Sequence, residues 1–199
     1  MSKLEKLLVV IGLIVTVLFA HSLLSREPYQ GNIADPVQQN LTNVQIINTP
    51  GEDGDVQISL LAEYNIEAVV KGKRKYSDYP SQVSKYDFAL AWGDLNEKEI
   101  DKNIKYSQSG RWYYYRYSDD TPVSGEYIAN HSANVHLIHK DKDILNEIKK
   151  IRVNEHVRLQ GYLVSVNFKN GPWKSSLSRT DTGNGSCEIM YVTDIETIE

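Results

Sequence analysis

The hydrophobic pattern of the chain begins with one long apolar run close to the N-terminus. Residues 7–20 (LLVVIGLIVTVLFA) carry no charge, and two further leucines extend the apolar stretch to residue 24. This length is just sufficient for a helix that spans a bilayer. The pattern predicts a signal anchor over residues 1–25, with Lys3 and Lys6 kept in the cytoplasm by the positive-inside rule. A cleaved signal peptide is the alternative, although the best cleavage site, at residues 20–22, is a poor match.

A polar segment without periodicity follows the apolar run. Residues 26–55 contain three prolines, three glycines and many Asn and Gln residues, which predicts a linker. Within this segment only residues 44–47 suggest a short strand. The remaining residues, 56–199, are long enough for one soluble domain with its own hydrophobic core, and no second domain is expected.

Short apolar runs after residue 55 predict a β-rich domain. The predicted strands cover residues 56–61, 66–70, 111–117, 135–138, 156–168 and 188–192. Residues 84–92 have apolar spacings that fit one or two helical turns, and residues 96–99 look like a capping box that opens a short helix. The clearest helix begins after Asp141, because its isoleucines recur on one helical face.

The long strand over residues 156–168 changes its pattern half-way. Its apolar positions are odd-numbered up to Leu163 and even-numbered from Val164 onward. We therefore expect a β-bulge near these two residues that keeps both halves facing one core. A helix that leads into such a strand, with Gly161 inside it, resembles small barrels of the OB and SH3-like kind, where a glycine or bulge bends a strand.

These elements together predict an α+β fold. An N-terminal transmembrane helix would be followed by a curved, barrel-like antiparallel sheet (OB/SH3-like) with two or three short helices.

Charge and cysteine content restrict the classes of partner. The net charge is −4, whereas a nucleic-acid binder needs a basic face, so nucleic acid is disfavoured as a partner. The one dense basic run, Lys71 to Lys75, is interpreted as a solvated loop or strand end. The single cysteine, Cys187, excludes an intramolecular disulfide and a cysteine-based zinc cluster.

A histidine-rich segment is the first candidate site. A turn between His131 and His136 would allow both to contribute to a metal site with Asp181 or Glu188. The spacing matches no known ligand signature, however. We therefore expect structural or surface roles for the histidines and predict neither a metal nor a cofactor.

The segment from Trp173 to Glu188 is the second candidate site. It groups hydroxyl, charged and thiol side chains around two glycines, which permit backbone N–H groups to turn toward a ligand. Arg179 in this segment would suit a carboxylate or another anion. A polar hairpin loop is the simpler alternative. Cys187 lacks a basic neighbour that would activate a nucleophile, so a half-buried structural role is expected.

Aromatic residues form the third candidate. Alternate residues of the strand at 111–117 (RWYYYRY) form two aromatic faces. One face is expected in the core, and the other would suit stacking on sugar rings or bases.

Three segments resemble a group of uncharacterised, membrane-anchored bacterial proteins. They are residues 86–93 (YDFALAWG), residues 131–138 (HSANVHLI) and residues 173–188, from WKSSL to GSCE. The resemblance covers residues 60 to 193, approximately. It implies a bacterial envelope setting and no particular activity.

The sequence therefore predicts a non-enzymatic binding or accessory domain on the periplasmic side of the inner membrane. Its expected partners are the membrane and a protein or glycan ligand. The candidate ligand-binding residues are His131, Asn134, His136, Trp173, Ser175, Arg179, Asp181 and Cys187. The alternative is an envelope hydrolase or transferase that uses Cys187 or a serine with one of the two histidines.

Overall fold

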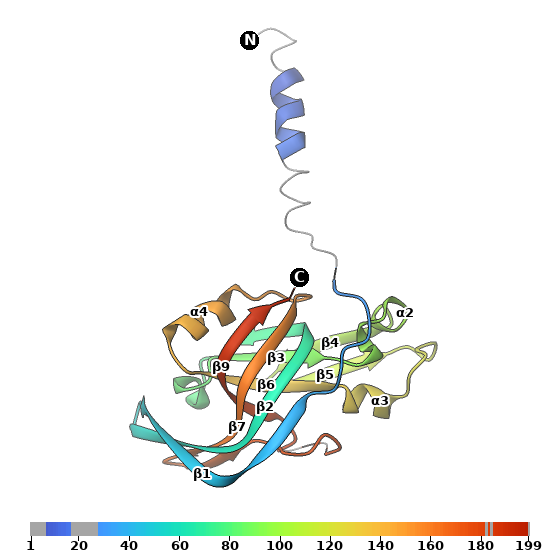
Figure 1. The fold of residues 1–199 in the computed structure, drawn as a ribbon. Helices are drawn as coiled ribbons and strands as arrows, with labels where there is room; N and C mark the ends of the chain where they lie inside the picture. Colours follow the sequence, from blue (N-terminus) through green and yellow to red (C-terminus); the bar gives the residue numbers. More distant parts are fainter. Residues whose placement is uncertain (1–6, 17–27, 182, 184, 199) are drawn as a thin grey trace.

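Strands dominate the protein (Figure 1). The computed structural model describes residues 7–16, 28–181, 183 and 185–198. The strands are β1 (Val37–Gly51), β2 (Gly54–Lys75), β3 (Tyr86–Ala91), β4 (Ile104–Ser109), β5 (Trp112–Tyr117), β6 (Ser132–His139), β7 (His156–Phe168), β8 (Gly171–Lys174) and β9 (Glu188–Thr197). The short helices are η1 (Tyr79–Gln82), η2 (Asp94–Asn96), α2 (Lys98–Asp101), α3 (Gly125–Asn130) and α4 (Lys142–Lys150).

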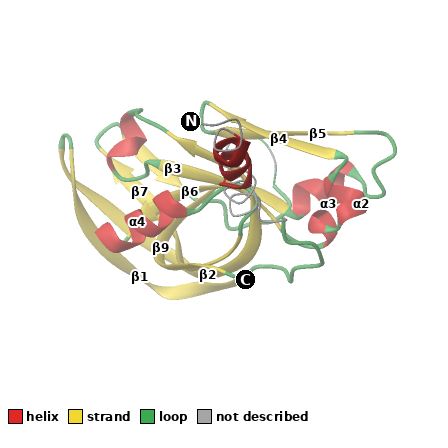
Figure 2. Ribbon diagram, turned by 90° about the horizontal axis from the view of Figure 1, so that it is seen from above, coloured by secondary structure: helices red, strands yellow, loops and turns green. Residues whose placement is uncertain are grey.

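Five of the strands close into a barrel. The neighbours run β2, β3, β6, β9, β7, and β7 then pairs with β2 again. Numbered along the chain, these strands follow the order 1-2-3-5-4-1, with the third and fifth, β6 and β9, parallel. A five-stranded barrel with these crossing connections is of the OB type. Figure 1 and Figure 2 show α4 on one side of the barrel and the pair α2 and α3 on the other.

The barrel interior holds the main hydrophobic core. Tyr64, Phe88 and Trp92 are its largest fully buried side chains. Ile144 and Ile148 from α4 join the same core. Because burial of apolar surface is the main driving force of folding, this core determines the position of every strand around it.

A second apolar layer lies outside the barrel. The first half of β2 and the last half of β7 continue beyond the barrel with β1 and β8 as their outer neighbours. Ile58 of β2 and Val166 of β7 pack there with Ile138 of β6 and Ile189 of β9. The outer face of the barrel is therefore covered by an extension of its own strands.

The apolar positions of β7 change from odd to even numbers because its two halves pack into these two cores. The bulge predicted in β7 is therefore wrong. Leu60 pairs with Val164 and Ala62 with Leu163, which leaves Leu61 of β2 as the extra residue. β7 therefore alternates without a break, and its two halves bury opposite faces in different cores.

Gly161 marks the bend of β7 against β9. A Cβ atom at this position would overlap the carbonyl oxygen of Tyr191. The ladder between the two strands skips Thr193 at the same point. The close approach of the two backbones therefore requires glycine.

Two predicted elements differ from the structure. Residues 86–91, expected to be helical, form β3, and its residues from Asp87 onward are buried on both faces. A strand covered on both sides shows no alternation, so its apolar spacing resembled that of a helix. The segment expected as a linker contains β1, which pairs with β2 from Val37 to Gly51.

The predicted membrane anchor is also contradicted. Residues 7–16 are helical and exposed, and residues 17–25 lie outside the described part of the chain. Among the residues that the structure describes, no helix is long and apolar enough to cross a membrane. The predictions of a transmembrane helix, of an α+β fold behind it and of an inner-membrane location are therefore wrong, and the described chain is mostly β.

Candidate functional site

The candidate residues lie in four places in the structure. Asn134, Arg179, Asp181 and Cys187 line one pocket. His136 and Trp173 pack together in a buried polar network. Ser175 is buried in the turn after β8, and His131 lies apart at the end of α3.

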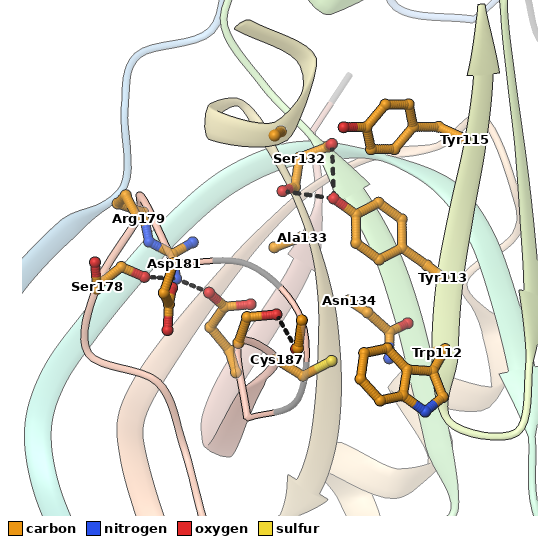
Figure 3. A pocket seen from close by; sticks show the side chains of 14 residues that line it. Trp112, Tyr113, Tyr115, Ser132, Ala133, Asn134, Ser178, Arg179, Asp181 and Cys187 are labelled. Atoms are coloured by element: carbon orange, nitrogen blue, oxygen red, sulfur yellow. Dashed lines mark hydrogen bonds and ion pairs between the residues drawn. The ribbon is translucent and has the colours of Figure 1, made fainter. Parts of the chain in front are cut away.

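The pocket lies between β5, the start of β6 and the loop over residues 178–188 (Figure 3). Its volume is about 180 Å³. Figure 3 shows Trp112, Tyr113 and Tyr115 of β5 on one side and Arg179 and Asp181 of the loop on the other. The site therefore combines an aromatic wall with a polar wall.

Arg179 and Glu188 form an ion pair in this pocket. Glu188 is the first residue of β9 and is only 2% exposed, while the guanidinium of Arg179 lies 5.9 Å from the ring centroids of Tyr64 and of Trp92. The second carboxylate oxygen, Oε2, has no hydrogen-bond partner among the described residues, and neither has Arg179 Nε. Buried polar atoms are seldom left unpaired, so the carboxylate oxygen and the guanidinium N–H are the groups of this ion pair with unused hydrogen-bonding capacity.

The Cys187 thiol is not arranged as a nucleophile. Burial raises the pKa of this thiol to about 11, and only the thiolate attacks, so the group is unreactive near neutral pH. The two histidines proposed as its base bind carboxylates instead. His136 Nδ1 lies 2.8 Å from Asp87, and His131 Nε2 lies 3.6 Å from Asp35.

The serines of the same segment have structural roles. Ser175 Oγ donates to the carbonyl of Ser176 and accepts from the backbone N–H of Ile189, at 2.8 and 3.0 Å. Ser176 Oγ donates to the carboxylate of Asp181 at 2.6 Å. These bonds fasten the loop to β9 and fix the position of Asp181.

A buried charged network, which the sequence did not indicate, lies beside the pocket. The carboxylate of Asp87 is fully buried and accepts from Arg111 Nη1 at 2.6 Å. Its other oxygen lies 2.8 Å from His136 Nδ1, and the ring of Trp173 packs on His136 with centroids 4.7 Å apart. Arg111 thus compensates the buried charge of Asp87, and the ring of His136 lies against its other oxygen.

Arg111 is held in place by the turn between β4 and β5. Gly110 and Arg111 both have positive φ, 58° and 69°, as in the type I′ turn of tight hairpins. The guanidinium also donates to the carbonyl of Ser84 at 2.8 Å and to the carboxylate of Asp78 at 2.6 Å. Hydrogen bonds from Arg111 lower the pKa of Asp78 to about 2. The hairpin is therefore fastened over the outer face of β3 and β6.

Asn134 joins this hairpin to the barrel. Its amide oxygen accepts from Gln108 at 2.8 Å, and its amide nitrogen donates to the carbonyl of Arg111 at 3.0 Å. The Asn134 side chain lines the pocket, but its amide oxygen and its amide nitrogen already have hydrogen-bond partners. Its role is therefore to position the aromatic wall.

His131 belongs to a different cluster from His136. Its ring stacks on Tyr127 with centroids 3.8 Å apart, and its Nδ1 lies 2.9 Å from the carbonyl of Tyr127. Gly93 packs so closely that a Cβ atom there would lie 2.6 Å from the ring. The two histidines do not converge, and the described residues contain no group of three metal-binding side chains.

The basic run at residues 71–75 is used to stabilise the fold. Lys71 is buried and pairs with Asp101 at 2.6 Å. Lys73 Nζ donates to three carbonyls at the end of α4, at 2.7 to 2.9 Å, and burial lowers the pKa of this ammonium. The interpretation of the run as a solvated segment is therefore wrong for these two lysines.

Comparisons with known proteins assign no family. No family model, no curated protein and no solved structure matches the chain. The resemblance to membrane-anchored bacterial proteins stays a prediction, and a function has to be inferred from the pocket itself.

Proposed function

We propose that the domain is a non-enzymatic binding module that holds one small hydroxyl-bearing ligand, such as a single sugar ring, in this pocket. The observation that carries the proposal is Glu188. Glu188 lines the pocket, its side chain is almost fully buried, and its Oε2 has no hydrogen-bond partner in the described chain. A carboxylate oxygen of this kind accepts hydrogen bonds from hydroxyl groups.

The aromatic wall supports a ligand with a flat apolar face. Trp112 is 38% exposed, so part of its ring is available to a ligand. The Tyr113 hydroxyl donates to Ser132, whose carbonyl and hydroxyl oxygens both lie 3.1 Å away, and this contact fixes the wall beside Trp112. Small-molecule sites typically combine aromatic walls with a few polar groups. Sugar rings offer both an apolar face and hydroxyl groups, and a pocket of about 180 Å³ suits one ring.

Catalysis has no comparable support in this pocket. The thiol is protonated, both serine hydroxyls are bonded to the loop, and the histidines bind carboxylates elsewhere. A nucleophile with a base in hydrogen-bond reach is the minimum for covalent catalysis. A hydrolase or transferase based on Cys187 or a serine is therefore the less supported alternative.

Saturation-transfer NMR with glucose, galactose and N-acetylglucosamine tests the proposal. We expect at least one of these sugars to bind, and Trp112→Ala to weaken it at least tenfold through loss of the stacking surface. Tyr114→Ala is the matched control, because Tyr114 lies on the same strand, is 51% exposed and does not line the pocket. No binding at millimolar sugar, or equal weakening by both variants, would overturn the proposal.

A further inference from the structure

β1 presents an open edge of the sheet. It pairs with β2 along one side, and its other side has no strand partner within the described chain. Figure 1 shows it as the outermost strand at this margin of the sheet. Unpaired backbone N–H and C=O groups along such an edge form a template for another strand.

This edge carries only part of the usual protection against pairing, namely Pro50 near its end and an irregular stretch before Gln45. None of the fifteen residues of β1 is charged, whereas edge strands commonly carry lysines or other charges that repel a second strand. The pairing with β2 is irregular between Asn40 and Gln45, but it then continues without a break from Gln45 to Gly51. The regular, uncharged part of the edge is thus seven residues long.

Two apolar side chains, one within this segment and one directly before it, are exposed. Val44 is 67% exposed and Ile46 is 52% exposed. Their neighbour Ile47 packs partly into the second apolar layer. One face of the edge segment is therefore anchored in the protein, while the other offers apolar surface that none of the described residues covers.

We propose that β1 pairs with β1 of a second copy of this chain, antiparallel, about a twofold axis near Ile46. A twofold axis at Ile46 places Ile46 opposite Ile46 of the other copy, Gln45 opposite Ile47 and Val44 opposite Asn48, so the contact covers the middle of β1. Because the segment is uncharged, no like charges meet, and Ile46 of each copy covers that of the other. The two extension sheets would then become one continuous sheet.

The acidic turn after β1 favours the antiparallel direction. Glu52, Asp53 and Asp55 lie at the tip of the β1–β2 hairpin, next to Gly51. Antiparallel pairing about Ile46 sends the two tips to opposite ends of the joint sheet. Parallel pairing would bring six carboxylates together and repel the copies.

Cysteine cross-linking of the full chain tests this interface. In a Cys187→Ser background, Ile46→Cys places two thiols across the twofold axis, and we expect a disulfide-linked dimer under mild oxidation. Ser107→Cys, exposed on β4 away from the edge, is the matched control and should stay largely monomeric. Equal cross-linking of the two variants would overturn the proposal.

Sedimentation provides the second measurement. Ile46→Lys removes no buried side chain, so the fold is expected to persist, but it sets two cations opposite each other at the axis. We expect the dimer of the unmodified chain to dissociate at least tenfold more readily in this variant. Unchanged sedimentation of Ile46→Lys, or a single-chain mass for the unmodified protein at 100 μM, would contradict the interface. Sugar binding should be unaffected, because β1 does not line the pocket.

Discussion

Arg111 holds three elements together from the tip of one hairpin. Its guanidinium contacts Asp78 before η1, the carbonyl of Ser84 and the buried carboxylate of Asp87 in β3. Arg111 has a positive φ, which is unfavourable for any residue other than glycine. The charge contacts offset that conformational cost, so the hairpin depends on this one residue.

Replacing Arg111 by methionine should destabilise the protein strongly. The change removes the cation from a fully buried carboxylate, and breaking a buried ion pair costs roughly 3–5 kcal/mol. Arg116→Met on the same hairpin is the control, because Arg116 is exposed. We expect urea unfolding to show a much lower midpoint for Arg111→Met and little change for Arg116→Met. Similar midpoints for the two variants would mean that the buried network contributes little.

The thiol of Cys187 should react slowly with iodoacetamide in the folded protein. Burial raises its pKa to about 11, so the thiolate fraction is very small at pH 8 and grows as the pH approaches 11. The control is Ser107→Cys in a Cys187→Ser background, an exposed thiol with an ordinary pKa of about 8.5. Fast modification of Cys187 at pH 7 would instead support an enzyme that uses Cys187 as its nucleophile.

At the scale of elements, Lys73 links β2 to α4. Its ammonium donates to the carbonyls of Ile148, Lys149 and Ile151, where the helix ends without its own hydrogen bonds. The cation also complements the helix dipole at this end.

Lys73→Met should therefore cost about 1.5–3 kcal/mol, the range for hydrogen bonds that involve a charge. Hydrogen exchange would show the loss as faster exchange in α4, more than in the barrel strands. Lys75→Met, at the exposed end of the same strand, should leave both properties unchanged. Identical exchange in the two variants would argue against this role of Lys73.

An element can be predicted from the sequence when the interactions that define it come from residues close to it in the chain. α4 begins after Asp141, whose side chain caps it, and β7 spans residues 156–168, so both follow from nearby sequence alone. β3 was missed because burial on both faces removed its alternation, and β1 because its partner β2 alone makes it a strand.

The candidate site was predictable to a similar extent. The loop over residues 173–188 was singled out by its composition, and the structure brings Arg179, Asp181 and Cys187 to one pocket. The pairing of Asp87 with Arg111 and His136 could not be foreseen, because these residues come from different strands and meet only through the barrel order. Glu188 was considered as a metal ligand, but its unpaired oxygen depends on tertiary packing.

At the scale of the molecule, this protein covers the outer face of its own barrel. OB-type barrels commonly bind ligands on their second and third strands, which here are β3 and β6. In this chain the β4–β5 hairpin and the extension of β2 and β7 occupy that face. The pocket beside Trp112 and Glu188 lies at the edge of this covered face, and it suits a small ligand better than a polymer.

The most direct test of the pocket is protein-observed NMR of the folded chain during a titration with the sugar that binds best. We expect the largest shifts to fall on Trp112, Asn134, Cys187 and Glu188, and to saturate together. Shifts spread over the surface, or centred on another part of the barrel, would contradict the assignment of the ligand site to this pocket.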